Sequence, residues 1–109
     1  MRIIENVKIA QDTYKMVLQP TGLESKKLKT LVPGQFINIK IDGFYLRRPI
    51  SIADWNDESL TIIYKVVGKG TQALSEMEPG IKLDILWPLG NGYNLTWIPH
   101  SAILIGGGV

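Results

Sequence analysis

The stretch "SLTIIYKVVGKGTQAL", residues 59–74, contains both kinds of secondary structure that the sequence predicts. Its first half alternates apolar and other residues with a period of two, which is typical of a β-strand. The residues that share the apolar face are Leu60, Ile62, Tyr64 and Val66. The glycines at 68 and 70 then interrupt the strand, and residues 71–78 follow without Gly or Pro, with Leu74 and Met77 three apart. This second half predicts a short helix.

The period of two recurs on both sides of this stretch, for example in "QFINIKI", residues 35–41. Sharp turns at Pro33-Gly34 and Pro79-Gly80 precede two of the alternating segments, and Thr21-Gly22 opens a predicted loop. We expect strands near residues 3–9, 13–19, 35–41, 46–53, 60–67, 81–87 and 102–105. Several short strands with one short helix predict an all-β antiparallel barrel or sandwich.

The composition excludes several classes of function. The chain has 109 residues, which fits one domain, and its net charge of +2 arises from 12 basic and 10 acidic residues. This balance argues against a nucleic-acid or membrane partner. The absence of cysteine excludes disulfides and iron–sulfur ligation within these residues. No signal-peptide or bilayer-spanning apolar run is present, so we expect a cytoplasmic protein.

The stretch "LRRPISIA", residues 46–53, places two arginines in a predicted strand. The planar guanidinium of Arg48 suits a phosphate or a carboxylate. Pro49 fixes the backbone and removes one ladder donor, and the hydroxyl of Ser51 can bond a polar ligand. The alternative is an edge strand whose arginines face water and discourage pairing between sheets.

Two glycine-containing stretches are further candidates for ligand contact. In "GKGT", residues 68–71, glycines allow close backbone approach, and Thr71 either caps the helix or bonds a phosphate oxygen. In "WPLGNGY", residues 87–93, Asn91-Gly92 predicts a type I′ turn, either in a surface hairpin or in a tight loop beside a flat ring. We see no metal-ligand spacing and no nucleophile–base pair, and assign no role to His100.

The last segment, "AILIGGGV", residues 102–109, is an apolar strand that runs into three glycines. A strand of this kind opens a nucleotide-binding βα unit. It is either a frayed tail or the beginning of a further domain, and we expect the second.

In this order, "LRRPISIA", "IIYKVVGKGTQAL", "EPGIKLDILWPLGNGY" and "AILIGGGV" resemble the ferredoxin–NADP reductase superfamily. More closely, they resemble the electron-transfer subunits of NAD-dependent dihydroorotate dehydrogenases, over nearly the whole chain. The resemblance implies a six-stranded antiparallel Greek-key barrel with one short helix that binds FAD over residues 1–101. Residues 102–109 would be the first strand and Gly-rich turn of a truncated NAD-binding domain.

The same resemblance implies the site. The superfamily's flavin motif is Arg-x-Tyr/Phe/Thr-Ser, and residues 48–51 occupy it. The implied cofactor-binding residues are Arg48, Pro49, Ile50, Ser51, Ile63, Tyr64, Lys65, Gly70 and Thr71. Arg48 would contact the pyrophosphate, Gly70-Thr71 would hold phosphate at the helix, and "PLGNG" would approach the flavin ring from another side. Because neighbours on a strand alternate, Arg47 would face away, toward solvent or a partner.

Three positions depart from the superfamily's pattern. Ile50 stands where an aromatic residue is common, Lys65 where an arginine is common, and Trp87 where glycine is usual, which would alter access near the ring. The dihydroorotate branch tolerates the change at Ile50.

The function that the resemblance implies is electron transfer in pyrimidine biosynthesis. Electrons would pass between NAD and an FMN-containing, dihydroorotate-oxidising catalytic subunit, with NAD and an iron–sulfur cluster bound only in the full-length protein. We therefore expect the chain alone to bind flavin without turnover, and we name no catalytic acid or base. Two alternatives stay open: a flavin reductase or other NAD(P)H-dependent oxidoreductase, and a flavin-free protein-interaction barrel.

Overall fold

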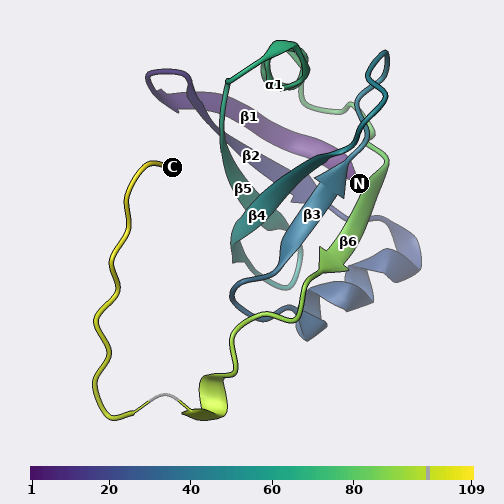
Figure 1. Cartoon of the computed structure of the whole chain (residues 1–109). Helices are drawn as coiled ribbons and strands as arrows, with labels where there is room; N and C mark the ends of the chain where they lie inside the picture. Colours follow the sequence, from purple (N-terminus) through teal and green to yellow (C-terminus); the bar gives the residue numbers. More distant parts are fainter. Residues whose placement is uncertain (98) are drawn as a thin grey trace.

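Six antiparallel strands form one sheet in the order β1-β2-β5-β4-β3-β6 (Figure 1). The computed structural model describes residues 1–97 and 99–109. The strands are β1 (Arg2–Ala10), β2 (Thr13–Gln19), β3 (Phe36–Ile39), β4 (Arg48–Trp55), β5 (Leu60–Lys65) and β6 (Ile85–Leu89). The helical segments are η1 (Gly22–Thr30), α1 (Lys69–Ser75) and η2 (Leu95–Trp97). The antiparallel order with crossovers confirms the predicted fold class.

The two outer strands of the sheet approach each other at one end. The amide of Ile3 in β1 donates to the carbonyl of Ile81, which precedes β6, at 2.9 Å. The amide of Gly80 donates to Ile3, and that of Leu83 to Met1, at 2.7 and 2.8 Å. The sheet is therefore barrel-like: the start of β1 is paired with residues 80–83, and no ladder joins β1 to β6 itself.

The core follows from the alternation within the strands. In β5, Leu60, Ile62 and Tyr64 are buried, whereas Ile63 and Lys65 lie on the outer face. The other buried residues of the core are Ile3, Met16, Leu18, Leu28, Leu31, Ile37, Ile39, Ile41, Leu74, Leu83 and Trp87. One face of each strand thus fills the core, and the opposite face of β5 is left available for a ligand.

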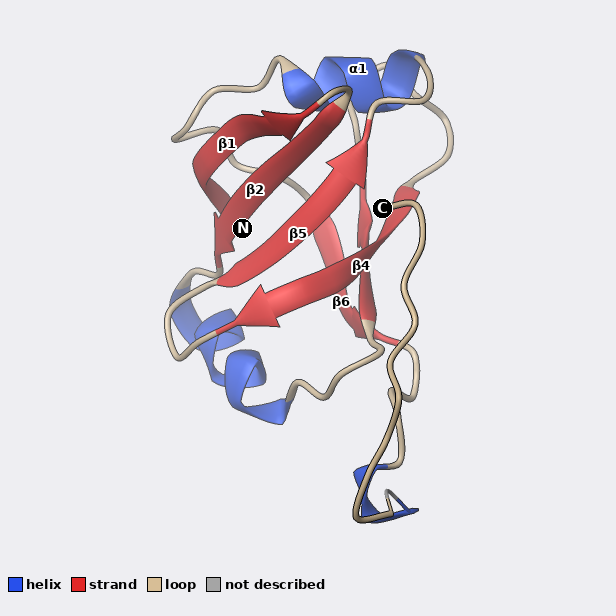
Figure 2. Cartoon of the chain, turned by 90° about the vertical axis from the view of Figure 1, so that its left-hand side faces the viewer, coloured by secondary structure: helices blue, strands red, loops and turns tan. Residues whose placement is uncertain are grey.

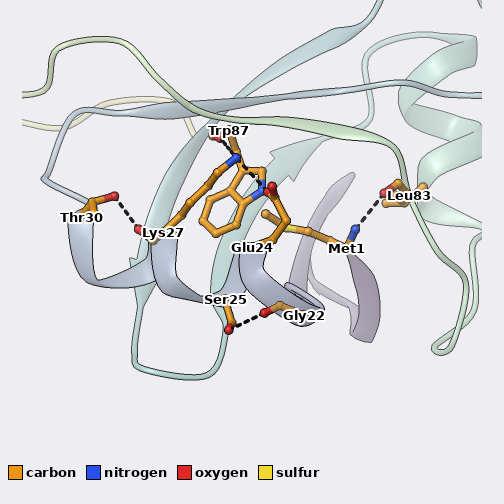
Figure 3. A network of polar contacts seen from close by, with 8 residues as sticks. All are labelled: Met1, Gly22, Glu24, Ser25, Lys27, Thr30, Leu83 and Trp87. Atoms are coloured by element: carbon orange, nitrogen blue, oxygen red, sulfur yellow. Dashed lines mark hydrogen bonds and ion pairs between the residues drawn. The ribbon is translucent and has the colours of Figure 1, made fainter.

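Helix α1 and segment η1 lie at opposite ends of the sheet, and the short η2 lies away from it (Figure 2). Helix α1 begins two residues earlier than predicted, and η1 replaces the predicted loop. Contacts three residues apart hold η1, as the 3₁₀ geometry requires: Ser25 donates to Gly22, and Lys27 pairs with Glu24 at 2.9 Å (Figure 3). Because Leu28 is its only buried residue, the segment carries no apolar periodicity.

Two expectations about the second half of the chain are wrong. Asn91-Gly92 does not form a type I′ turn, because Gly90 and Gly92 have positive φ and Asn91 does not. Residues 102–105 are not in a strand, and their side chains are almost fully exposed, since no neighbouring strand offers them a ladder. Within the described residues, no helix has the length and apolar character needed to cross a bilayer.

Candidate functional site

A pocket of about 340 Å³ opens between β4, β5 and the start of α1. Its lining residues are Arg48, Pro49, Ile50, Ser51, Ile63, Tyr64, Lys65, Val67, Thr71 and Val109. Eight of the nine sequence-predicted binding residues therefore lie around one pocket, and the ninth, Gly70, is in contact with Arg48. The grouping arises because β4 and β5 are neighbours in the sheet and α1 follows β5 directly.

Arg48 joins the two walls of this pocket. Its Nη1 donates to the carbonyl of Leu46, and its Cζ lies 5.5 Å from the centre of the Phe44 ring. A Cβ atom at Gly70 would lie 2.6 Å from Nε and 2.8 Å from Nη2 of Arg48. The guanidinium therefore packs between an aromatic ring and the backbone of α1, in a space that only glycine leaves open.

Thr71 organises the connection from β5 to α1. Its Oγ1 accepts the amide of Val67 at 2.9 Å and that of Gly68 at 3.2 Å. Of the two roles that the sequence left open for this hydroxyl, the structure shows the capping one. The hydroxyl also fixes the course of the backbone where the chain enters the pocket wall.

Arg47 faces away from the pocket, as the alternation predicts. Its Nη2 forms an ion pair with Asp84 Oδ2 at 3.0 Å, and its Nη1 donates to the Asp84 carbonyl at 3.1 Å and to that of Asn38 at 3.4 Å. The two neighbouring arginines thus do different things: Arg47 ties β4 to the segment before β6, and Arg48 lines the pocket.

The segment from Trp87 to Gly92 does not line this pocket, and its expected approach to the flavin ring from another side stays a prediction. Trp87 is buried in the core, with Lys27 Nζ 5.6 Å from its ring centre (Figure 3). The ammonium of Lys27 also hydrogen-bonds Glu24 and thereby lowers the pKa of that carboxyl. Trp87 therefore fixes η1 to the barrel, and its effect on access near the ring stays a prediction.

Asn6 is a functional candidate that the sequence reasoning missed. Its Oδ1 accepts the hydroxyl of Tyr64 at 2.9 Å, and its Nδ2 donates to carbonyls at the end of α1. Tyr64 also stacks on Tyr14, with ring centres 5.8 Å apart. Burial raises the pKa of Tyr64 to about 12, so its hydroxyl stays protonated and donates to Asn6 at neutral pH. An asparagine inside a strand, where that residue is depleted, was the available signal.

The chemistry of the pocket suits an elongated anion with an apolar part. Arg48 and Lys65 supply cations, while Pro49, Ile50 and Ile63 supply apolar surface. A second hollow of about 450 Å³ shares Ser51, Ile63 and Val109 with the first, so the surface continues along β4 and β5.

Comparison with known proteins gives a consistent group of relatives. The chain is 45% identical over 96% of its length to the "Dihydroorotate dehydrogenase B (NAD(+)), electron transfer subunit" of Fusobacterium nucleatum. It spans about two fifths of the length of the curated relatives that it matches. No protein-family model matches the sequence.

Solved structures with the same fold include an oxidoreductase and a flavohemoglobin. A NADH-dependent reduced ferredoxin–NADP oxidoreductase, studied for flavin-based electron bifurcation, is 31% identical and superposes with a TM-score of 0.75. The match covers 85% of this chain and 33% of that protein. A flavohemoglobin from Malassezia yamatoensis with bound FAD and heme is 24% identical, with a TM-score of 0.66 over 83% of this chain and 24% of that protein, and shows the fold alone. The barrel is ferredoxin reductase-like.

Proposed function

Since the chain is a homologue of part of the dihydroorotate dehydrogenase B electron transfer subunit, we propose that it binds FAD in the pocket between β4, β5 and α1. The observation that supports this most strongly is the packing of the Arg48 guanidinium against Gly70 at the pocket wall. When bound, FAD supplies the redox chemistry, exchanging a hydride with a nicotinamide and single electrons with other centres. The residues of this chain supply position and charge.

Each of the nine predicted binding residues has a proposed role. Arg48 binds the pyrophosphate, because its Nε and Nη2 lie beside Gly70 in the first turn of α1, next to Thr71, which lines the same pocket. Pro49, Ile50 and Ser51 run along the isoalloxazine and ribityl groups. The remaining contacts come from the neighbouring strand through Ile63, Tyr64 and Lys65, and from Gly70 and Thr71 of α1.

The full-length protein would be a cytoplasmic electron-transfer subunit. It would pass electrons between NAD and an FMN-containing catalytic subunit that oxidises dihydroorotate, in pyrimidine biosynthesis. Residues 102–109 would begin an NAD-binding domain, and the iron–sulfur cluster would be bound outside these 109 residues. By itself the chain would bind flavin without turnover.

Titration of the purified chain with FAD, followed by quenching of flavin fluorescence, tests the proposal. We expect saturable binding, and for Arg48→Ala a loss of roughly 1.5–3 kcal/mol from the missing charge-assisted contacts. Arg47→Ala is the matched control, since that side chain is engaged by Asp84 outside the pocket, and should bind FAD nearly as well as the wild type. A wild-type chain that leaves the fluorescence unchanged would favour the flavin-free barrel instead.

A second candidate is another NAD(P)H-dependent flavin oxidoreductase, which the 31% identity to the ferredoxin–NADP oxidoreductase favours. Affinity purification of the full-length protein separates the two. Recovery of an FMN-containing dihydroorotate-oxidising subunit supports the first candidate, and reduction of ferredoxin or free flavin by NAD(P)H without that subunit supports the second.

A further inference from the structure

A bulge in β1 turns Asn6 toward the inside of the barrel. The register of β1 on β2 shifts between Ile3 and Glu5, so that Ile3 lies opposite Leu18 and Asn6 lies opposite Met16. Leu18 and Met16 are both fully buried, and directly opposed residues of an antiparallel pair share a face. Alternation alone would place Glu5 on the same face as Ile3. The extra residue of the bulge instead turns the side chain of Asn6 to that face.

At this inner position Asn6 holds the C-terminal end of α1. Its Nδ2 lies 3.0 Å from the carbonyl oxygens of Leu74 and Met77 and 3.5 Å from that of Ser75, so it spans the last residues of α1 and the turn that follows. Its Oδ1 is occupied by the Tyr64 hydroxyl at 2.9 Å. Three carbonyl acceptors on one side and one hydroxyl donor on the other fix the orientation of the amide.

The opposite end of the same helix carries the contact with Arg48. Helix α1 has seven residues and is about 10 Å long, so a shift at its C-terminal end is passed on to Gly70. Gly70 leaves no room for even one carbon atom beside Arg48 Nε. The place of α1 therefore decides where the guanidinium can lie.

We propose that Asn6 is a positioning residue for flavin binding: by holding the end of α1 it sets the place of Gly70, and through it the orientation of Arg48 toward a pyrophosphate. The inference rests on the proposed function, and deepens it by predicting selectivity for phosphate-bearing flavins. Asn6 itself does not line the pocket.

The variant that isolates this role is Asn6→Asp. It keeps an acceptor for Tyr64 and loses the donor to Leu74 and Met77. We expect the dissociation constant for FAD to rise about tenfold and that for riboflavin, which has no phosphate, to change less than about twofold. The control is Leu28→Ala, a core change in η1 at the opposite end of the barrel (Figure 2). It should lower stability and leave the ratio of the two affinities unchanged.

A double-mutant cycle with Arg48→Ala gives a second test of the positioning role. If Asn6→Asp folds poorly, Asn6→Ala can take its place in the cycle. In an Arg48→Ala background, either change at Asn6 should alter FAD affinity less than about twofold, because the group that it positions is gone. Additive losses, or equal losses for FAD and riboflavin, would overturn the positioning role. A wild-type chain that binds neither flavin would instead overturn the proposed function.

Discussion

At the scale of single residues, the contact between Arg48 and Gly70 is the one on which the candidate site depends. Residues 48–51 and 68–71 are separate in the sequence, and each has an ordinary structural explanation. The sheet places them together because β4 pairs with β5 and α1 follows β5 immediately. The sequence motif predicts that something approaches the backbone closely at Gly70. The structure shows that the approaching group is the guanidinium of Arg48.

Gly70→Ala is predicted to separate stability from binding. Alanine gains up to about 1 kcal/mol of helix propensity over glycine, but its Cβ must displace the flexible Arg48 side chain. We expect the free energy of unfolding to change by less than about 1 kcal/mol and FAD affinity to fall about tenfold. The matched control is Gly68→Ala, because Gly68 is extended and nothing lies within 4 Å of its added Cβ. Equal FAD affinity in the two variants would refute the role of the contact.

Tyr64 is predicted to make stability depend on alkaline pH. Its pKa is raised, chiefly by burial, from 10.0 to about 12, so the folded state binds the phenolic proton more tightly than the unfolded state does. The stabilisation is fully present below pH 10 and is lost as the pH rises toward 12. Urea unfolding across this pH range should show that the free energy of unfolding falls more steeply with pH for the wild type than for Tyr64→Phe. Parallel declines would mean that another group dominates.

At the scale of elements, the period of two predicted the strands well and failed where a bulge or a polar helix interrupts it. In β1, simple alternation groups Ile3, Glu5 and Val7, whereas the bulge after Ile3 turns Asn6 inward. A single sequence does not indicate where a strand contains a bulge. The inward position of Asn6 was therefore not predicted. Segment η1 was also missed, because a polar 3₁₀ helix with one buried residue has the composition of a loop.

Leu28→Ala tests whether η1 belongs to the core or only covers it. The side chain is 1% exposed and belongs to the buried cluster. Its truncation is expected to lower the free energy of unfolding by about 2–5 kcal/mol, as for other buried leucines. Leu23→Ala in the same segment is the control, since Leu23 is 81% exposed and should cost less than about 0.5 kcal/mol. Denaturant unfolding of both variants gives the answer, and similar small losses would show that η1 frays without consequence.

At the scale of the whole molecule, the alternation predicted an antiparallel barrel or sandwich, and the resemblance to the ferredoxin–NADP reductase superfamily implied the barrel and the grouping of the predicted residues. Motifs on adjacent strands needed only the right strand order to meet. The approach of the two outer strands at one end was less predictable, because it depends on backbone hydrogen bonds between Ile3 and residues 80–81, which carry no side-chain pattern. The same limit applies to residues 102–105, whose strand-like composition forms no strand where no neighbouring strand is present.

The exposed tail is predicted to affect association and not folding. Ile103, Leu104 and Ile105 are 91%, 96% and 94% exposed, so their apolar surface contributes nothing to the core and remains free to contact other molecules. Deletion of residues 101–109 should change the free energy of unfolding by less than about 0.5 kcal/mol. The same deletion should reduce concentration-dependent self-association in sedimentation experiments. Replacing the three residues by serine in the full chain should have the same effect, which separates apolar surface from chain length as the cause. A deletion that lowers stability by more than about 1 kcal/mol would show that the tail stabilises the barrel beyond the contact of Val109 at the pocket.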